Sequence, residues 1–199
     1  MSYKINNRKT KLKPSVDPSQ LSDEKLVDEI IKTKDSTLFA ELYDRFAPLV
    51  YNKCLGFAKS KVEAEDLTHD IFIKLFVKLD SFKGKSKFST WLYSFTYNFC
   101  VNYIERNTYK RREKVQESET IKDKPLVEVT DEDILQMKTQ KLKKVLSIID
   151  PNDKMILLMK YQDELSIKEL AETLGVGESA VKMRLKRARE KAMEIYKTV

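Results

Sequence analysis

The sequence predicts an all-α protein of two small helical domains joined by a flexible acidic linker, with a helix-turn-helix in the second domain. Glycine and proline, which interrupt helices, number only 4 and 5 among 199 residues. Apolar residues recur at helical spacing in both halves, and no segment shows the alternation that is typical of a strand. An acid-rich stretch without apolar periodicity separates the halves and marks the linker.

The first domain is expected at residues 21–112, after a disordered basic tail at 1–20. Its first helix, 21–33, can be capped by the hydroxyl of Ser22. The next helix contains Pro48, which predicts a kink or a restart, because proline removes a helical hydrogen bond. The helix after it carries one apolar stripe that we expect to face the core, formed by Leu67, Ile71, Leu75 and Leu79.

A short polar loop, 83–87, then leads into an aromatic-rich helix. Basic side chains and aromatic rings alternate there, in an arrangement that suits unpaired nucleic acid: cations follow phosphates, and rings stack on or pocket a base. The residues concerned are Phe82, Lys83, Lys85, Lys87, Phe88 and Trp91. Core packing is the alternative for the rings. We favour it for Phe95 and Phe99 and leave Trp91 open.

The charge of the chain is +7 and its isoelectric point about 9.1. A basic surplus fits a polyanion such as nucleic acid or anionic lipid, although solubility alone would also account for it. Cys54 and Cys100 lie in apolar surroundings and form no CxxC motif, which predicts buried free thiols and neither a zinc finger nor a redox motif. Because no secretory signal or apolar run of about 20 residues occurs, we expect a soluble cytoplasmic protein without membrane insertion.

The linker is expected at residues 113–133, which hold eight acidic residues and three lysines. The second domain follows at 134–199 and opens with one helix over 134–150. Pro151 suits the start of the next helix, since proline is favoured at the first helical position.

The helix-turn-helix is predicted by three features at matching spacing. Ser166 and Glu169 form a capping box at the start of one helix, and Gly175 suits the left-handed residue at its end. Val176 can fill the turn, and the second helix is expected to start near Glu178. On this second helix, one stripe must pack inward, formed by Val181, Leu185, Ala188 and Ala192.

The opposite side of the second helix is basic and suits the major groove of DNA. Its central residues are Ser179, Lys182, Met183, Lys186 and Arg187, with Arg184 and Arg189 on the flanks where they can reach phosphates. A solvated amphipathic helix would explain the cations. It would not explain why a capping box, a turn and an apolar stripe occur together.

Two blocks of this sequence resemble bacterial sigma factors, the promoter-specificity subunits of RNA polymerase. "AEDLTHDIFIKLF" and "LDSFKGKSKFSTWLY" resemble the region that binds core polymerase and melts the minus-ten element. "LSIKELAETLGVGESAVKMRLKRAREK" resembles the region that reads the minus-thirty-five element. The two blocks, in this order with only a short linker between them, resemble the extracytoplasmic-function (ECF) subgroup.

The resemblance implies three sets of site residues. The residues that it assigns to core polymerase binding are Glu65, Asp66, Asp70, Ile71 and Lys74. Minus-ten binding and melting falls to Phe82, Lys83, Gly84, Lys85, Ser86, Lys87, Phe88, Trp91 and Asn98, with Arg106, Lys110, Arg111 and Arg112 extending the basic track. Minus-thirty-five binding falls to Ser179, Lys182, Met183, Arg184, Lys186, Arg187 and Arg189. Ala180, Met183 and Lys186 depart from frequent family choices, so the bases they read cannot be copied from a relative.

The resemblance also implies the partners. They are promoter DNA, the beta-prime and beta subunits of core polymerase, and an anti-sigma factor, while the free chain is a monomer that joins the nucleoid only within holoenzyme. It implies no cofactor, no metal and no enzymatic activity. The acidic linker is either a passive tether or a nucleic-acid mimic in the polymerase channel.

Two other functions fit parts of the sequence. A stand-alone helix-turn-helix regulator would bind duplex DNA without polymerase. A metal-dependent nuclease could be built on Glu65, Asp66, His69 and Asp70, but these lie on one helix with no converging partner.

Overall fold

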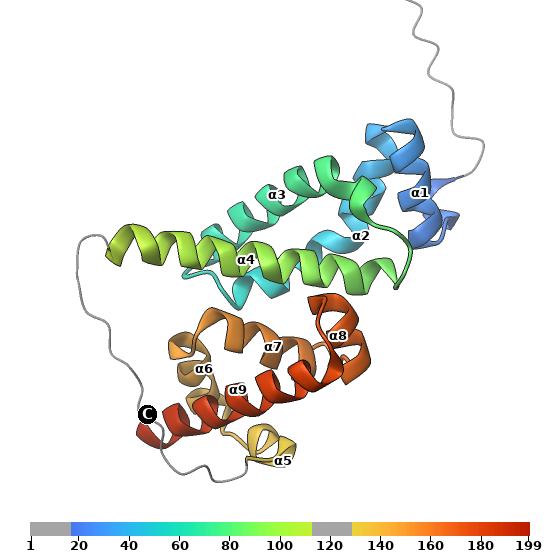
Figure 1. The fold of residues 1–199 in the computed structure, drawn as a ribbon. Coiled ribbons are helices and arrows are strands. Elements are labelled where there is room, and N and C mark those ends of the chain that lie inside the picture. The colour runs from blue at the N-terminus through green and yellow to red at the C-terminus, as the bar shows by residue number, and fades with distance from the viewer. Residues whose placement is uncertain (1–16, 113–128) are drawn as a thin grey trace, which may run out of the picture.

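The computed structural model describes residues 17–112 and 129–199, and every regular element within them is helical. The first part contains the short turn η1 (Pro18–Gln20), α1 (Asp23–Thr33), α2 (Ser36–Leu55), α3 (Lys61–Lys78), η2 (Leu79–Ser81) and α4 (Phe88–Arg112). The second contains α5 (Asp131–Leu135), α6 (Thr139–Ile148), α7 (Pro151–Tyr161), α8 (Ile167–Leu174) and α9 (Glu178–Thr198) (Figure 1). The all-α prediction is confirmed. None of the described helices is both long and apolar enough to cross a membrane.

The first domain is built around α2, which packs against α1, α3 and α4. The predicted stripe of α3 and η2 is confirmed as core, since Leu67, Ile71, Leu75 and Leu79 are at most 2% exposed. Cys54 and Cys100 are both buried free thiols, as the sequence predicts.

Pro48 does not restart the helix, because α2 runs unbroken from Ser36 to Leu55. An interior proline costs a helix about 3 kcal/mol. Phe46 and Val50, on either side of it, are buried at 4% and 0% exposure. Each such apolar side chain contributes about 1.5–3 kcal/mol on burial, so the packing outweighs the lost hydrogen bond.

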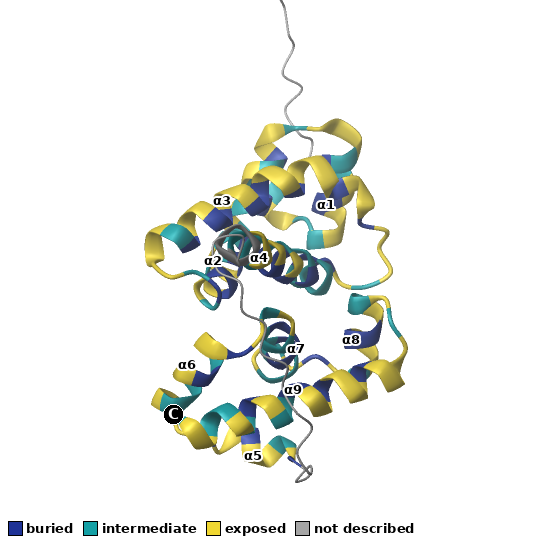
Figure 2. Cartoon of the chain, turned by 60° about the vertical axis from the view of Figure 1, so that its left-hand side comes forward, coloured by how far each residue is buried: buried dark blue, intermediate teal, exposed yellow. Residues whose placement is uncertain are grey.

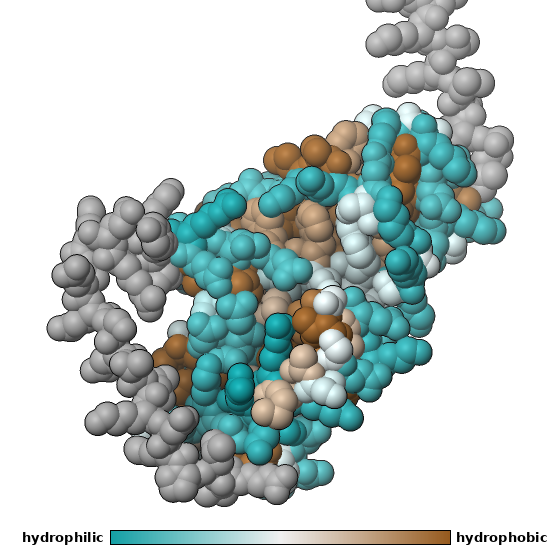
Figure 3. Space-filling view, viewed as in Figure 1, coloured by the Kyte–Doolittle hydropathy of each residue, from teal (hydrophilic) through white to brown (hydrophobic). Residues whose placement is uncertain are grey.

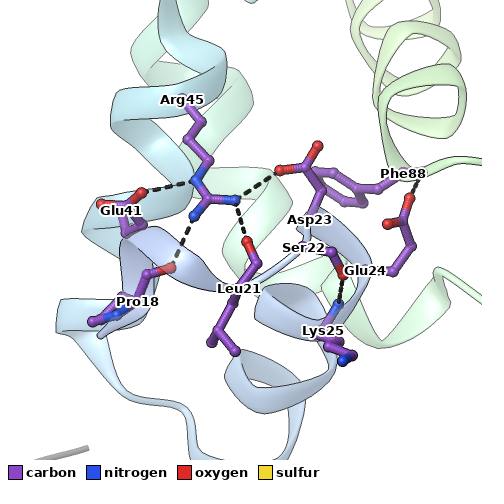
Figure 4. Close-up of polar contacts among 9 residues, drawn as sticks. All are labelled: Pro18, Leu21, Ser22, Asp23, Glu24, Lys25, Glu41, Arg45 and Phe88. Carbon is purple, nitrogen blue, oxygen red and sulfur yellow. Dashed lines mark hydrogen bonds and ion pairs between the residues drawn. The ribbon is translucent and has the colours of Figure 1, made fainter. Parts of the chain in front are cut away.

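Arg45 ties the start of the first domain to α2 (Figure 4). Its guanidinium donates to the carboxylates of Glu41 and Asp23 and to the backbone carbonyls of Leu21 and Pro18, at 2.8–2.9 Å. Residues 17–20, which the sequence assigns to the tail, therefore belong to the described first domain. Tail residues 1–16 lie outside the described part.

The caps of two helices meet in the same region. Ser22 accepts a hydrogen bond from the backbone of Lys25, which confirms the predicted cap of α1. The carboxylate of Glu24 accepts from the backbone N–H of Phe88 at 3.2 Å (Figure 4). This bond satisfies one free donor at the start of α4 and sets the position of the loop before it.

The second domain is built around α9, which packs against α5, α6, α7 and α8. The single helix expected at 134–150 is wrong: α5 and α6 are separate, with a break at 136–138. Met137 turns into the core at 7% exposure, and the backbone N–H of Lys138 donates to the Tyr196 hydroxyl of α9. These contacts between distant residues replace the helical bonds lost at the break.

The predicted linker extends too far toward the second domain. Its last three residues, 131–133, form the first turn of α5, where Thr130 and Asp133 make a capping box. Acidic side chains are favourable at a helix N-terminus, so the acidity of these residues serves the helix. Residues 113–128 lie outside the described part.

The two domains contact each other along α4, which packs against α7 and α8. Figure 1 shows α4 lying across these two helices. Exposed residues cover the outer sides of α3 and α9, away from this contact (Figure 2). Both the acidic side of α3 and the basic side of α9 are therefore outer surfaces of the molecule.

Candidate nucleic-acid interface

The helix-turn-helix forms as the sequence predicts. Ser166 and Glu169 make the reciprocal capping box: the Glu169 backbone N–H donates to Ser166 Oγ at 3.2 Å, and the Ser166 N–H donates to Glu169 Oε2 at 2.9 Å. These bonds lower the pKa of Glu169, which therefore stays ionised. Gly175 ends α8 with φ +64°, in the left-handed region that favours glycine. The turn is thus specified by local chemistry.

The inward stripe of α9 is confirmed by burial. Val181, Leu185, Ala188 and Ala192 are at most 5% exposed and pack into the second domain. The apolar stripe fixes the rotation of α9 about its own axis, and therefore which residues point to solvent.

The outward side of α9 is cationic and unpaired. Seven residues of this side are predicted to meet DNA, and all but Arg189 are exposed. The six exposed residues are Ser179, Lys182, Met183, Arg184, Lys186 and Arg187. Met183 is 50% exposed. Within the described chain, none of the four cations forms an ion pair with another side chain. The helix therefore presents positive charge that no acid of residues 17–112 or 129–199 neutralises, as a phosphate-binding surface requires.

Arg189 departs from the prediction. Its side chain is only 22% exposed and is ion-paired with Asp131 at the start of α5. Asp131 also accepts a hydrogen bond from the Tyr161 hydroxyl at 2.7 Å, and the two partners together hold the pKa of this carboxyl below its usual range. Arg189 thus fastens α5 to α9 and is not free to grip a phosphate.

The loop before α4 exposes its cations, as a nucleic-acid site needs. Lys83, Lys85 and Lys87 point to solvent, and Ser86 is partly exposed. Gly84 has φ +66° with open space around it, so the tip of the loop turns where glycine is favoured. Lys83 Nζ donates to the backbone carbonyl of Asp80 at 2.9 Å, which holds the first of these cations against the end of η2.

The aromatic rings around this loop are more deeply placed than a base-capturing loop implies. Phe82 and Phe88 are buried at 7% and 0% exposure, with ring centroids 5.3 Å apart in an edge-to-face contact. Both rings contact Trp91, at 5.5 Å and 5.8 Å. In this structure the two phenylalanines belong to the core, because edge-to-face packing stabilises them there.

Trp91 and Asn98 lie nearer the surface. Trp91 is partly exposed and stacks on Phe95 with ring centroids 5.4 Å apart. Asn98 is exposed two turns further along α4 and donates a hydrogen bond to Ser94 Oγ at 3.4 Å. Arg106 is exposed as well, while the side chains of Lys110, Arg111 and Arg112 lie outside the described part.

The α3 surface combines acids with apolar side chains. Glu65, Asp66 and Asp70 are exposed, and Lys74 is exposed with its ammonium 5.3 Å from the Phe99 ring. Ile71, in contrast, is 0% exposed and cannot touch a partner. We correct its assignment: Ile71 packs α3 onto the core, on the side opposite its exposed residues.

Sequence reasoning missed the apolar part of this surface. Figure 3 shows apolar side chains reaching the surface over α3. The exposed apolar residues of α3 are Val62, Ile73 and Val77, which are 65%, 67% and 69% exposed, with Phe76 at 38%. Their positions opposite the buried stripe were the available signal, because apolar residues on the outer side of an amphipathic helix mark a contact surface. Among the described residues, no cluster of three or more potential metal ligands occurs, at His69 or elsewhere.

Both sequence blocks match models of known protein families. Residues 42–109 match the sigma-70 region 2 model, and residues 139–191 match the sigma-70 region 4 model. The ECF RNA polymerase sigma factor SigW of Bacillus subtilis is 31% identical over 168 residues, which are 80% of this chain and 89% of that protein. The ECF RNA polymerase sigma-E factor of Escherichia coli is 29% identical over 180 residues, covering 86% and 92%.

Solved structures share the fold. The sigma factor RpoE of Bartonella quintana, in complex with the anti-sigma factor NepR, gives a TM-score of 0.54 at 21% identity, covering 80% of this chain and 96% of that one. CnrH, in complex with the cytosolic domain of CnrY, gives 0.56 at 18% identity, covering 87% and 96%. With a helix-turn-helix that displays unpaired cations, a region 2 block before it and these relatives, the chain belongs to the ECF sigma factors.

Proposed function

We propose that this chain directs promoter-specific transcription initiation as a dissociable subunit of RNA polymerase, with a separate task for each exposed surface. The observation that carries the proposal is the presence, in one chain, of a cationic recognition helix and a region 2 block with its own exposed cations and docking helix. A stand-alone regulator would need only the first of these, so we do not favour that alternative.

The basic side of α9 is proposed to read the minus-thirty-five element. Lys182, Met183, Lys186 and Arg187 are placed for base edges, and Arg184 for phosphates. Met183 offers a soft apolar contact, which suits a thymine methyl group.

The loop at 83–87 and the start of α4 are proposed to act at the minus-ten element. The exposed lysines suit the phosphates of the melted strand, and Trp91 and Asn98 are the nearest surface groups for base contacts. Capture of a base by Phe82 or Phe88 would require these buried rings to move, so their first role is to support Trp91.

The surface of α3 is proposed to dock on the beta-prime subunit of core polymerase. Its exposed acids can pair with basic groups of the partner, and the apolar residues Ile73 and Val77 can be buried in the contact. Both solved relatives are complexes with a second protein, which in one of them is named as an anti-sigma factor, so we propose an anti-sigma partner here. We further propose that the chain is cytoplasmic, that it joins the nucleoid within holoenzyme and that it has no catalytic activity of its own.

Run-off transcription tests the function. Purified chain is added to cognate core polymerase, without any inhibitor, on a template that carries a candidate promoter from its own genome. We expect transcripts from one start site that depend on the added chain. Tight binding of the free chain to duplex DNA, with no transcript from any template, would instead favour the stand-alone regulator.

A further inference from the structure

A buried ion pair joins the two domains. Lys53 Nζ, in the last turn of α2, lies 2.5 Å from Asp163 Oδ1, just after α7. Both side chains are only 5% exposed. The Lys53 ammonium also lies over the rings of Tyr93 and Tyr97 of α4, at 3.8 Å and 5.1 Å from their centroids. The pair is therefore enclosed by the first domain on one side and the second on the other.

The polar groups around this pair are incompletely satisfied. The second carboxylate oxygen of Asp163 is buried without a well-oriented hydrogen bond among the described residues. Burial, together with the nearby Asp163 carboxylate, raises the pKa of the Tyr97 hydroxyl, so these two groups interact with each other. Burial lowers the pKa of Lys53 in spite of its acidic partner, so desolvation outweighs the attraction of Asp163. A buried pair in such surroundings contributes little net stability, because few bonds offset the loss of its hydration.

The rest of the interface combines polar contacts with apolar packing, since the buried apolar side chains of the two domains form one continuous cluster. Ser94 Oγ of α4 donates to the backbone carbonyl of Thr173 of α8 at 3.3 Å. The Asn152 side chain of α7 donates to Glu105 at 2.9 Å, in an exposed position. Lys154 lies 5.1 Å from the centroid of the Phe57 ring.

The arrangement in which the two domains contact each other along α4 is called closed here. In this closed arrangement, the proposed minus-ten and minus-thirty-five surfaces lie too close together to reach both promoter elements at once. Ser94, which bonds α8, also accepts the hydrogen bond of Asn98 in the proposed minus-ten surface. Elements centred near minus ten and minus thirty-five are about 25 base pairs apart, or about 85 Å at about 3.4 Å per base pair. The 25 residues of α4 span only about 37 Å. The domains must separate before both elements can be read at once.

We propose that the Lys53–Asp163 pair is a releasable latch: it aligns the two domains in the free chain, and its charges regain hydration when the domains separate. The latch gives the closed state a specific geometry without a large net stability. Only its consequence for transcription rests on the proposed function, since opening is a property of the free chain.

The test compares three variants with the natural chain. Lys53→Met and Asp163→Leu each leave one buried charge without a partner, so each shifts the equilibrium toward the open form by roughly a hundredfold or more. The double variant, Lys53→Met with Asp163→Leu, removes both charges and fills similar volume, so it stays closed. Glu105→Ala is the matched control, because it removes only an exposed contact across the same interface.

Small-angle X-ray scattering and hydrogen exchange of the free proteins report opening without polymerase or DNA. We expect a larger radius of gyration and faster exchange in α8 for both single variants, and natural values or slower exchange for the double variant and the control. Circular dichroism shows that each variant keeps its helices. The proposal is overturned if the single variants stay closed, or if the double variant opens as far as they do. Failure of run-off transcription would remove the proposed function and leave these outcomes unaffected.

Discussion

Two cations of one helix, Lys186 and Arg189, have different contacts and therefore different roles. Both are cations of α9, three residues apart, and the sequence assigns both to DNA. Arg189 instead forms an ion pair with Asp131 at the start of α5. The two residues are 58 positions apart, so no local pattern in the sequence indicates this contact. Lys186 has no such partner in the described chain and stays available to DNA.

Lys186→Ala is expected to weaken binding to minus-thirty-five DNA by about 1–3 kcal/mol, because a base-edge contact is lost, and to reduce the slope of log affinity against log salt, because one cation fewer meets the DNA. Holoenzyme assembly should be unchanged, since α3 is untouched. Fluorescence anisotropy of labelled DNA, titrated with purified holoenzyme over a salt series, measures both the affinity and its salt dependence. Arg189→Ala is the paired control: it should lower thermal stability and leave the salt slope as it is. An equal loss of core binding in Lys186→Ala would contradict the separation of tasks.

The Asp131 carboxyl predicts a pH dependence. Tyr161 and Arg189 hold its pKa below the ordinary value of 3.8. A carboxyl with a lowered folded-state pKa stabilises the fold above its ordinary pKa, and this contribution is lost as pH falls through the lowered value. Urea unfolding followed from neutral pH into the acid range should show a smaller acid-induced loss for Asp131→Asn. The same loss in both proteins would mean that other carboxyls account for it.

At the scale of elements, the sequence predicts best where the structural signals are local. The capping box of Ser166 and Glu169, the left-handed Gly175 and the start of α9 at Glu178 all involve residues close in the chain, and all are confirmed. The break at 136–138 and the unbroken course of α2 through Pro48 depend on packing between distant residues. No periodicity in the sequence could indicate them.

The two sides of α3 give a matched pair of variants. Ile73→Asp places a charge on a 67% exposed apolar position, so it should weaken core polymerase binding by tenfold or more and leave the free energy of unfolding within about 0.5 kcal/mol. Ile71→Ala removes a fully buried side chain and should cost about 2–5 kcal/mol of stability. Chemical unfolding and binding to labelled core polymerase separate the two effects. Normal polymerase affinity in Ile73→Asp would remove this surface from the docking site.

At the scale of the whole molecule, the order of the two domains could be predicted, but their contact could not. Composition and helical spacing indicate two helical domains, and the motifs indicate what each does. Lys53 and Asp163 are 110 residues apart, and nothing near either of them in sequence indicates a partner. The same holds for Phe82 and Phe88, whose alternation with lysines suggests exposure, although they pack in the core against each other and against the rings of Phe46 and Trp91.

The central claim is that polymerase holds two readers of one chain at a set distance on the promoter. Run-off transcription from a promoter and from its derivative with five base pairs inserted between the two elements tests this directly. Five base pairs turn one element by about half a helical turn relative to the other. The account predicts that transcription with the chain and core polymerase falls at least tenfold on the derivative, although the isolated elements are unchanged. Equal transcription from both templates would contradict it.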